Sequence, residues 1–308
     1  MSGGVLVTGA TGFAGGHLLE HLGAPDDVVA WARHDPPPAL AGLARWETVD
    51  LLDRDSVRSG ISSLKPRAVY HFAGVTRVDT SWADPAGALR GNVLTTHYLL
   101  DALRRAGTRS RVLVTGSATI YAAADSPIRE DAPITADSPY AISKLAQEAL
   151  ALIPEDGLDV IVARAFNHTG PRQQPAFVAS SVARQVALIE RGALAPVLRV
   201  GNLDARRDLT DVRDVVRAYM SLVESAPPGQ VYNVASGVGR PIRSIVETLV
   251  RLAAVQVRIE VDPGRLRAQD KPVLVGDAGR LRAATGWEPR ISFEQTLRDL
   301  LDYWRATA

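Results

Sequence analysis

Short apolar runs rich in β-branched residues alternate with longer segments of helical spacing through the first half of the chain. Residues 4–8 predict a strand, and residues 15–22 repeat apolar positions at the interval of a helix face. Further runs with strand character follow at residues 28–32, 68–72, 112–115 and 160–165, separated by segments long enough for crossover helices. This alternation predicts an α/β fold built on a doubly wound parallel sheet of the Rossmann type.

The second half of the chain has a different character. From residue 167 it mixes Pro, Arg and short apolar runs, and only residues 231–235 (VYNVA) again resemble a clear strand. We therefore expect a dinucleotide-binding Rossmann domain over residues 1–166 and a smaller C-terminal α/β substrate lobe over residues 167–308. The strand at 231–235 could return to the first sheet.

Composition excludes several classes of function. Hydrophobic residues make up 46% and charged residues 22%, as in ordinary globular proteins. Lys and Arg number 35 and Asp and Glu 34, so no overall field favours nucleic acid or an anionic membrane. The chain has no cysteine, and no His–Asp–Glu cluster has metal-ligand spacing, so we expect no metal. Without a signal-peptide pattern or an apolar run near the ~20 residues of a bilayer span, we expect a cytoplasmic protein with no membrane partner.

Three glycines follow the first predicted strand at intervals of three residues. Gly9 permits a tight turn, Gly12 lets a pyrophosphate approach the backbone, and Gly15 lets the next helix pack closely on the strand. The N-terminus of that helix adds amide donors and a positive dipole. With a strand before it and a helix after it, this loop predicts a dinucleotide site more strongly than a flexible turn.

The end of the second predicted strand indicates which dinucleotide binds. NAD-dependent enzymes usually place an acidic residue there to bind the adenosine ribose hydroxyls. Residues 28–34 (VVAWARH) contain no acid, and Arg33 stands where the acid would be expected. An arginine suits a ribose 2′-phosphate, so the sequence favours NADP(H). The alternative is a solvated arginine that begins a loop.

Tyr140 and Lys144 lie four residues apart in a segment of helical character, which puts both side chains on one helix face. A lysine ammonium one turn away favours the phenolate, so we expect Lys144 to lower the pKa of Tyr140. Tyr140 could then transfer a proton as a carbonyl gains or loses a hydride. Ser117 ends another predicted strand, at the edge where open α/β sheets bind ligands, and could hydrogen-bond the same carbonyl oxygen.

Together these elements resemble the extended short-chain dehydrogenase/reductase family, in the branch that modifies nucleotide-linked sugars. The resemblance runs along almost the whole chain and includes residues 71–74 (HFAG) and Asn92 at the head of a helix. Four later motifs narrow it, at residues 164–172 (RAFNHTGPR), 207–214 (RDLTDVRD), 232–237 (YNVASG) and 285–287 (TGW). They are most similar to the GDP-4-keto-6-deoxy-D-mannose reductases and the related GDP-mannose 4,6-dehydratases.

The resemblance implies further site residues. For the cofactor it implies Gly9, Thr11, Gly12, Phe13, Gly15, Arg33, Asp50, Leu51, Phe72, Ala73, Gly74, Asn92, Thr115, Tyr140, Lys144 and Ala165. For the nucleotide sugar it implies Thr119, Asn167, His168, Arg172, Arg207 and Arg267. Asp50 could equally cap a helix or close a turn, and Arg172 could equally be structural. Relatives pair through two helices per subunit, here at residues 92–105 and 140–152, so a homodimer with a four-helix interface is expected.

The residues after Ser117 separate the reactions that this family catalyses. A 4,6-dehydratase resembles this chain except for carboxylates just after the serine or threonine, where this chain has Ala118 and Thr119, which cannot act as carboxylate bases. Residues 117–121 (SATIY) resemble UDP-galactose 4-epimerases, but those retain NAD and generally have an acid after the second strand. The resemblance therefore implies NADPH-dependent reduction of the C4 ketone of a nucleotide-linked 4-keto-6-deoxy-hexose, giving a rhamnose-type product or its C4 epimer. An NAD-retaining 4-epimerase is the alternative, and a non-catalytic NADP-binding scaffold is a more distant one.

Overall fold

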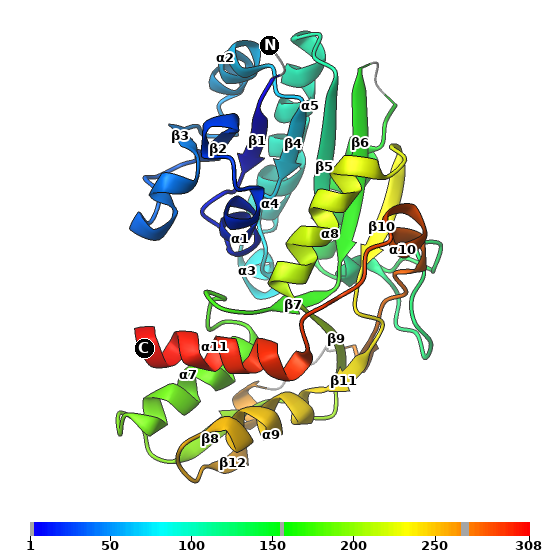
Figure 1. The fold of residues 1–308 in the computed structure, drawn as a ribbon. Coiled ribbons are helices and arrows are strands. Elements are labelled where there is room, and N and C mark those ends of the chain that lie inside the picture. Colours follow the sequence, from blue (N-terminus) through cyan, green and yellow to red (C-terminus); the bar gives the residue numbers. More distant parts are fainter. Residues whose placement is uncertain (1–2, 155–156, 266–270) are drawn as a thin grey trace.

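A computed structural model describes residues 3–154, 157–265 and 271–308. The molecule has a seven-stranded sheet with helices on both faces and a smaller C-terminal layer beyond one end of that sheet (Figure 1). The strands are β1 (Val5–Thr8), β2 (Val28–Ala32), β3 (Arg45–Thr48), β4 (Ala68–His71), β5 (Ser110–Ser117), β6 (Leu158–Ala165), β7 (Asn167–Thr169), β8 (Val197–Val200), β9 (Arg206–Asp211), β10 (Gln230–Val234), β11 (Gly239–Pro241), β12 (Arg258–Val261) and β13 (Val273–Leu274).

Eleven α-helices connect these strands over the described residues. They are α1 (Phe13–Leu22), α2 (Arg54–Leu64), α3 (Val78–Ala83), α4 (Pro85–Leu89), α5 (Thr95–Arg105), α6 (Pro139–Ala151), α7 (Val178–Glu190), α8 (Val212–Ser225), α9 (Ile242–Leu252), α10 (Gly279–Thr285) and α11 (Phe293–Thr307). One π-helical turn, Arg90–Leu94, joins α4 to α5, and a 3-10 turn, Ala118–Ile120, follows β5 directly.

The large sheet has the strand order β3-β2-β1-β4-β5-β6-β10, and every neighbouring pair is parallel. The predicted doubly wound parallel sheet is therefore confirmed. The order reverses between β1 and β4, and open α/β sheets bind ligands outside the carboxyl ends of strands at such a point. The predicted strand near residue 231 is β10, the edge strand of this sheet.

Alternating side chains along each strand build the two faces of the sheet. Val5 and Val7 of β1 pack in the core that includes α1 and α8, whereas Leu6 between them packs in the core with α2 and α5. Because successive residues of a strand point to opposite faces, a strand with helices on both sides must be apolar at every position. This explains the uninterrupted apolar runs in the sequence.

The C-terminal layer has its own core, formed by α7, α9 and α11 with β8 and the residues around it. Three elements from the second half of the chain pack instead with the large sheet, namely α8, β10 and α10. The chain therefore leaves the sheet after β6, near residue 166, and later returns to it. Strands β7 and β9 lie between the two layers, below the carboxyl ends of the large sheet (Figure 1).

Candidate active site

The three predicted catalytic side chains come together at the carboxyl edge of the sheet. Ser117 is the last residue of β5, and α6 begins at Pro139 with the Ser138 hydroxyl accepting a hydrogen bond from the Ala141 amide at 3.2 Å. That cap places Tyr140 in the first turn of α6, and Lys144 follows one turn later. Ser117 hydrogen-bonds the Tyr140 hydroxyl, and all three side chains are buried.

Burial, more than mutual attraction, governs the titration of this set. It raises the pKa of the Tyr140 hydroxyl, and the hydrogen bond from Ser117 opposes that rise. Burial also lowers the pKa of Lys144 to about 8. The pKa of Tyr140 is thus raised rather than lowered as expected, because burial outweighs any effect of Lys144 one turn away. The Lys144 ammonium instead donates to the Thr115 carbonyl oxygen at 3.0 Å and to Gln147 Oε1 at 2.9 Å.

The glycine loop packs closely against its neighbours and leaves the start of α1 uncapped. Gly9 has a φ of +66°, and a Cβ there would lie 2.6 Å from the Ala73 nitrogen. A Cβ on Gly15 would lie 2.4 Å from the Gly9 carbonyl oxygen, so α1 approaches the loop as closely as predicted. Among the described residues no side chain caps α1 at Gly12, and its first turn holds no acid. Those amides and the helix dipole suit a phosphate.

Other predicted cofactor residues surround this loop. Arg33 follows β2, is exposed, and forms no ion pair with any described residue. Asp50 is exposed and accepts a hydrogen bond from the Leu52 amide at 2.9 Å, which is the turn role left open by the sequence, while Asp53 caps α2. The remaining predicted residues at this edge that are exposed or partly exposed are Thr11, Phe13, Phe72, Ala73, Gly74, Thr115 and Ala165, and Leu51 is buried.

Asn92, which the resemblance implies for the cofactor, uses its side-chain amide for contacts within the protein. It is fully buried in the π-helical turn, its Oδ1 accepts from the Val75 amide at 2.9 Å, and its Nδ2 donates to the Ser143 hydroxyl at 2.8 Å. A Cβ on Gly74 would lie 2.3 Å from that same Oδ1. Asn92 therefore ties the loop after β4 to α6, because a buried amide has to use its donors and acceptors internally.

The predicted substrate residues divide into two groups. Thr119 lies beside the catalytic set, with its hydroxyl 2.9 Å from that of Ser117, and Asn167 is exposed at the start of β7. Arg207 is partly exposed on β9. Arg267 lies outside the described residues.

Arg172 and His168 face α1. The Arg172 guanidinium binds both carboxylate oxygens of Glu20, at 2.6 and 2.8 Å, which supports its structural alternative over the predicted contact with the nucleotide sugar. The His168 ring stacks on Phe13 with centroids 5.7 Å apart, and His17 Nε2 lies 2.9 Å from the Pro171 carbonyl oxygen. Phe13, His17 and Glu20, on one face of α1, thus contact β7 and the segment that follows it.

Two polar residues near the catalytic set were missed by the sequence analysis. Lys271 donates to the carbonyl oxygens of Thr119 and Tyr121, at 2.9 and 2.6 Å, and so fixes the turn after Ser117. Gln147 contacts Lys144, as described above. One signal in the sequence could have pointed to Lys271. The chain has only three lysines, Lys65, Lys144 and Lys271.

A buried ion pair stabilises the far side of α6. Glu148 accepts from Arg164 at 2.5 and 2.8 Å, and Arg164 also donates to the Tyr121 hydroxyl at 2.6 Å. Tyr121 in turn donates to Asn233 of β10 at 2.7 Å. These contacts join α6, β6 and β10 behind the catalytic face.

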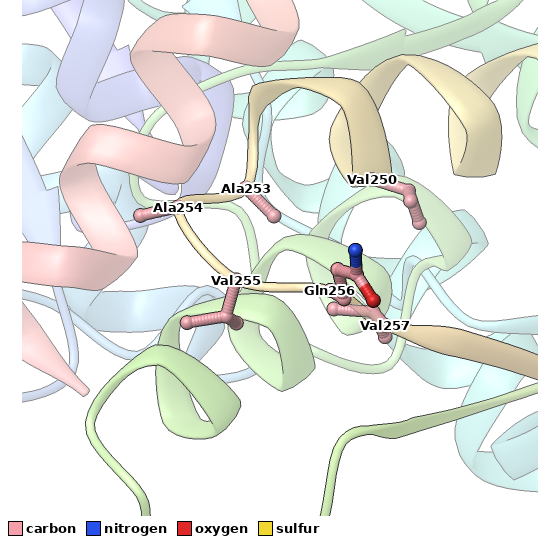
Figure 2. Close-up of a pocket in the computed structure, with 6 residues that line it drawn as sticks. All are labelled: Val250, Ala253, Ala254, Val255, Gln256 and Val257. Atoms are coloured by element: carbon pink, nitrogen blue, oxygen red, sulfur yellow. The ribbon is translucent and has the colours of Figure 1, made fainter.

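A surface hollow at the end of α9 is lined by Val250, Ala253, Ala254, Val255, Gln256 and Val257, none of which can transfer a proton near neutral pH (Figure 2). The described residues contain no group of three or more His, Asp or Glu side chains that could hold a metal ion. None of their helices combines the length and apolar character needed to cross a membrane.

Comparisons with known proteins agree with one another. A family model described as GDP-mannose 4,6 dehydratase matches residues 6–300. A protein named GDP-6-deoxy-D-mannose reductase, from Pseudomonas aeruginosa, is 40% identical, and the alignment covers 98% of this chain and 97% of the relative. A UDP-glucose 4-epimerase from Mycolicibacterium smegmatis is 28% identical over 97% of this chain and 98% of its own length. A solved structure titled RMD from P. aeruginosa complexed with NADPH superposes with a TM-score of 0.87 at 38% identity, covering all of both chains.

Proposed function

Because this chain belongs to the GDP-mannose 4,6 dehydratase family, we propose that it reduces the C4 ketone of GDP-4-keto-6-deoxy-D-mannose with NADPH. The relative at 40% identity, named as a reductase, supports the reaction and its substrate. The observation that carries reduction over dehydration lies beside Ser117. Ala118 and Thr119 follow it, the Thr119 hydroxyl bonds Ser117, and neither side chain can remove a C5 proton as a carboxylate would.

The described residues fit the proposed cofactor. The uncapped start of α1 provides amides for a pyrophosphate, and Arg33 lies exposed at the end of β2, where a ribose 2′-phosphate is held in NADP-binding Rossmann folds. When bound, NADPH supplies the hydride. Lys144 lies in the same edge and would bind the nicotinamide ribose, as the family resemblance implies. The sheet layer would thus carry the cofactor.

The catalytic set would supply the proton and hold the ketone. Tyr140 Oη gives its proton to the ketone oxygen as C4 gains the hydride, which leaves an alcohol on the sugar and a phenolate on the enzyme. Ser117 Oγ is bonded to the same hydroxyl, so it is placed to donate to the ketone oxygen as charge develops there. The ammonium of Lys144, one helical turn away, stabilises the phenolate.

The nucleotide-sugar end of the substrate would lie against the C-terminal layer, which the sequence predicts from about residue 167 onward. Its two phosphates need placed cations, since the whole chain carries a net charge of only +1. Arg207 on β9 is our candidate among the described residues, with Asn167 near the sugar or diphosphate. Arg267 is proposed for the same end from the resemblance.

We also propose that the enzyme is a cytoplasmic homodimer, joined through α5 and α6. Apolar side chains support this interface, because Ile142 on α6 is 50% exposed, Ile153 just after α6 is 55% exposed and Leu94 just before α5 is 37% exposed. A second copy of the same surface would cover them about a twofold axis, as most homodimers do.

One assay separates the proposed function from its alternative. Purified protein is mixed with NADPH and freshly generated GDP-4-keto-6-deoxy-D-mannose, and NADPH absorbance is followed. Loss of absorbance with stoichiometric formation of a 6-deoxyhexose product is expected. Interconversion of UDP-glucose and UDP-galactose without added cofactor would instead support the 4-epimerase, the alternative favoured by residues 117–121. Conversion of GDP-mannose to its 4-keto-6-deoxy product would contradict the argument from Ala118 and Thr119.

A further inference from the structure

A buried chain of hydrogen bonds runs from Lys144 into the core of the sheet. Gln147 Oε1 accepts from Lys144 Nζ at 2.9 Å, and Gln147 Nε2 donates to the Thr96 hydroxyl at 2.8 Å. His71 Nε2 lies 2.9 Å from the same hydroxyl, and His71 Nδ1 lies 2.7 Å from the Thr8 hydroxyl. Gln147 is 1% exposed, and Thr8, His71 and Thr96 are fully buried. The chain therefore links the strand that starts the glycine loop to the catalytic helix.

The donors and acceptors in this series of hydrogen bonds allow one arrangement. The Thr96 hydroxyl spends its proton on the Asn92 carbonyl oxygen at 2.7 Å, so it can only accept from its other neighbours. His71 must then carry its proton on Nε2, and Gln147 must present its NH₂ group to Thr96. The amide oxygen of Gln147 is left to face Lys144. If the Gln147 amide were flipped, its NH₂ group would face the Lys144 ammonium, donor against donor. Its oxygen would face the Thr96 hydroxyl oxygen, acceptor against acceptor.

The charged and titratable groups around Lys144 show why its partner Gln147 is neutral. The next residue of α6, Glu148, turns the other way and pairs with Arg164, so its carboxylate does not reach the ammonium. His71 on β4 stays neutral, since burial and the nearby Lys144 charge lower its pKa to about 3. Tyr140 on the same helix has a pKa that burial raises. Lys144 is thus held by two neutral acceptors, Thr115 O and Gln147 Oε1, and no carboxylate of the described residues pairs with it.

We propose that Gln147 is a positioning residue, whose amide oxygen fixes the direction of the Lys144 ammonium while leaving Lys144 without a permanent counter-charge. The direction is dictated by the buried hydroxyls and imidazole behind Gln147, which cannot rearrange without leaving a donor or acceptor unsatisfied. The inference rests on the proposed function, because it takes Lys144 as the residue that acts on Tyr140.

The test uses the small number of lysines in the chain. Protein labelled with ¹³C at lysine Cε gives one signal for each of Lys65, Lys144 and Lys271, and Lys65→Arg and Lys271→Arg assign them. Titration should show a midpoint for Lys144 of about 8 in the native protein. In Gln147→Glu the introduced carboxylate should raise that midpoint by at least about one pH unit. Gln147→Met should move it in the opposite direction, because an acceptor for the charged form is lost.

Activity provides the second readout. Both Gln147 variants should lose at least about tenfold in kcat, while KM for NADPH and for the nucleotide sugar stays within about threefold. The limb of the pH–rate profile that reports the titration of Lys144 should shift in each variant as the Lys144 midpoint shifts. Gln256→Glu is the matched control, since this exposed glutamine lies in the surface hollow at the end of α9 and should change neither measurement.

A folded Gln147→Glu with an unmoved Lys144 midpoint would overturn the proposal, as would unchanged kcat in both variants. If neither Gln147 variant folds, Thr96→Val decides the matter, because it removes the hydroxyl that orients Gln147 without touching Lys144. An unchanged Lys144 titration and kcat in that variant would also overturn it. The titration needs no substrate, so a failed reductase assay leaves this result intact and contradicts only the proposed function.

Discussion

The substitution Tyr140→Phe removes only the hydroxyl group, so it tests proton donation with little change in packing. We expect kcat to fall at least ~100-fold, because the ketone oxygen then lacks a positioned acid. The Kd for NADPH should stay within about twofold. Steady-state rates and a fluorescence titration of NADPH measure the two quantities. Turnover within fivefold of the native rate would remove Tyr140 from the mechanism.

Arg33 decides the choice of dinucleotide in the proposed site. Its guanidinium is exposed after β2 and has no carboxylate partner among the described residues, which leaves it available to a 2′-phosphate. The native protein should bind NADPH at least about tenfold more tightly than NADH, and Arg33→Ala should abolish most of that preference. Competitive titration of both cofactors checks this. Arg191→Ala, an exposed change at the end of α7, should leave the preference unaltered.

At the level of elements, two arginines from the C-terminal half should behave differently. Arg207→Gln on β9 should raise KM for the nucleotide sugar about tenfold and spare NADPH, because a placed cation for a phosphate is lost. Arg172→Gln should change KM for the nucleotide sugar less than about threefold, since its guanidinium already pairs with Glu20 of α1. Initial-rate kinetics on the two variants compare them directly. The reverse ranking would contradict the proposed substrate site.

The faces of α5 and α6 carry the prediction about assembly. Ile142→Arg should convert the proposed dimer to a monomer, since a charged side chain at the centre of an apolar interface would be buried without a partner. Sedimentation measures the mass. Val261→Arg on β12 is a matched control, because that valine is 55% exposed in the other layer. A native protein that sediments as a monomer would end the dimer proposal.

The elements themselves were largely predictable, for a local reason. Each of β1, β2, β4, β5 and β6 is a short contiguous apolar run in the sequence. Such a run can be identified from a few neighbouring residues. The grouping of elements into layers was less predictable. Helix α8 and strand β10 come from the second half of the chain yet pack on the first sheet, where their apolar side chains join its core.

For the molecule as a whole, buried histidines predict a loss of stability in mild acid. Burial lowers the pKa of His17 to about 4 and that of His71 to about 3, from a usual value of 6.5. As the pH falls below about 6.5 the unfolded chain takes up these protons first, so the free energy of unfolding falls between pH 6.5 and 4. Each histidine contributes a slope of up to about 1.4 kcal/mol per pH unit.

Chemical denaturation at several pH values measures this slope. His17→Gln should reduce it by about one proton, because that side chain no longer titrates. His34→Gln, at an exposed position after β2, is the control and should leave the slope unchanged. A stability that stays constant between pH 6.5 and 4 would contradict the prediction.

The sequence by itself determined the parallel sheet, the glycine loop, and the order and spacing of Ser117, Tyr140 and Lys144. Each of these depends on residues close together in the chain, where strand or helix geometry fixes which side chains share a face. Only the tertiary structure decided that Arg172 binds Glu20, 152 positions away, and that Gln147 meets Thr96, 51 positions away. It also turned Asn92 inward and left the pKa of Tyr140 raised. Such outcomes depend on which buried donors and acceptors meet between elements far apart in the sequence. The spacing of apolar residues within one segment carries no information about those contacts.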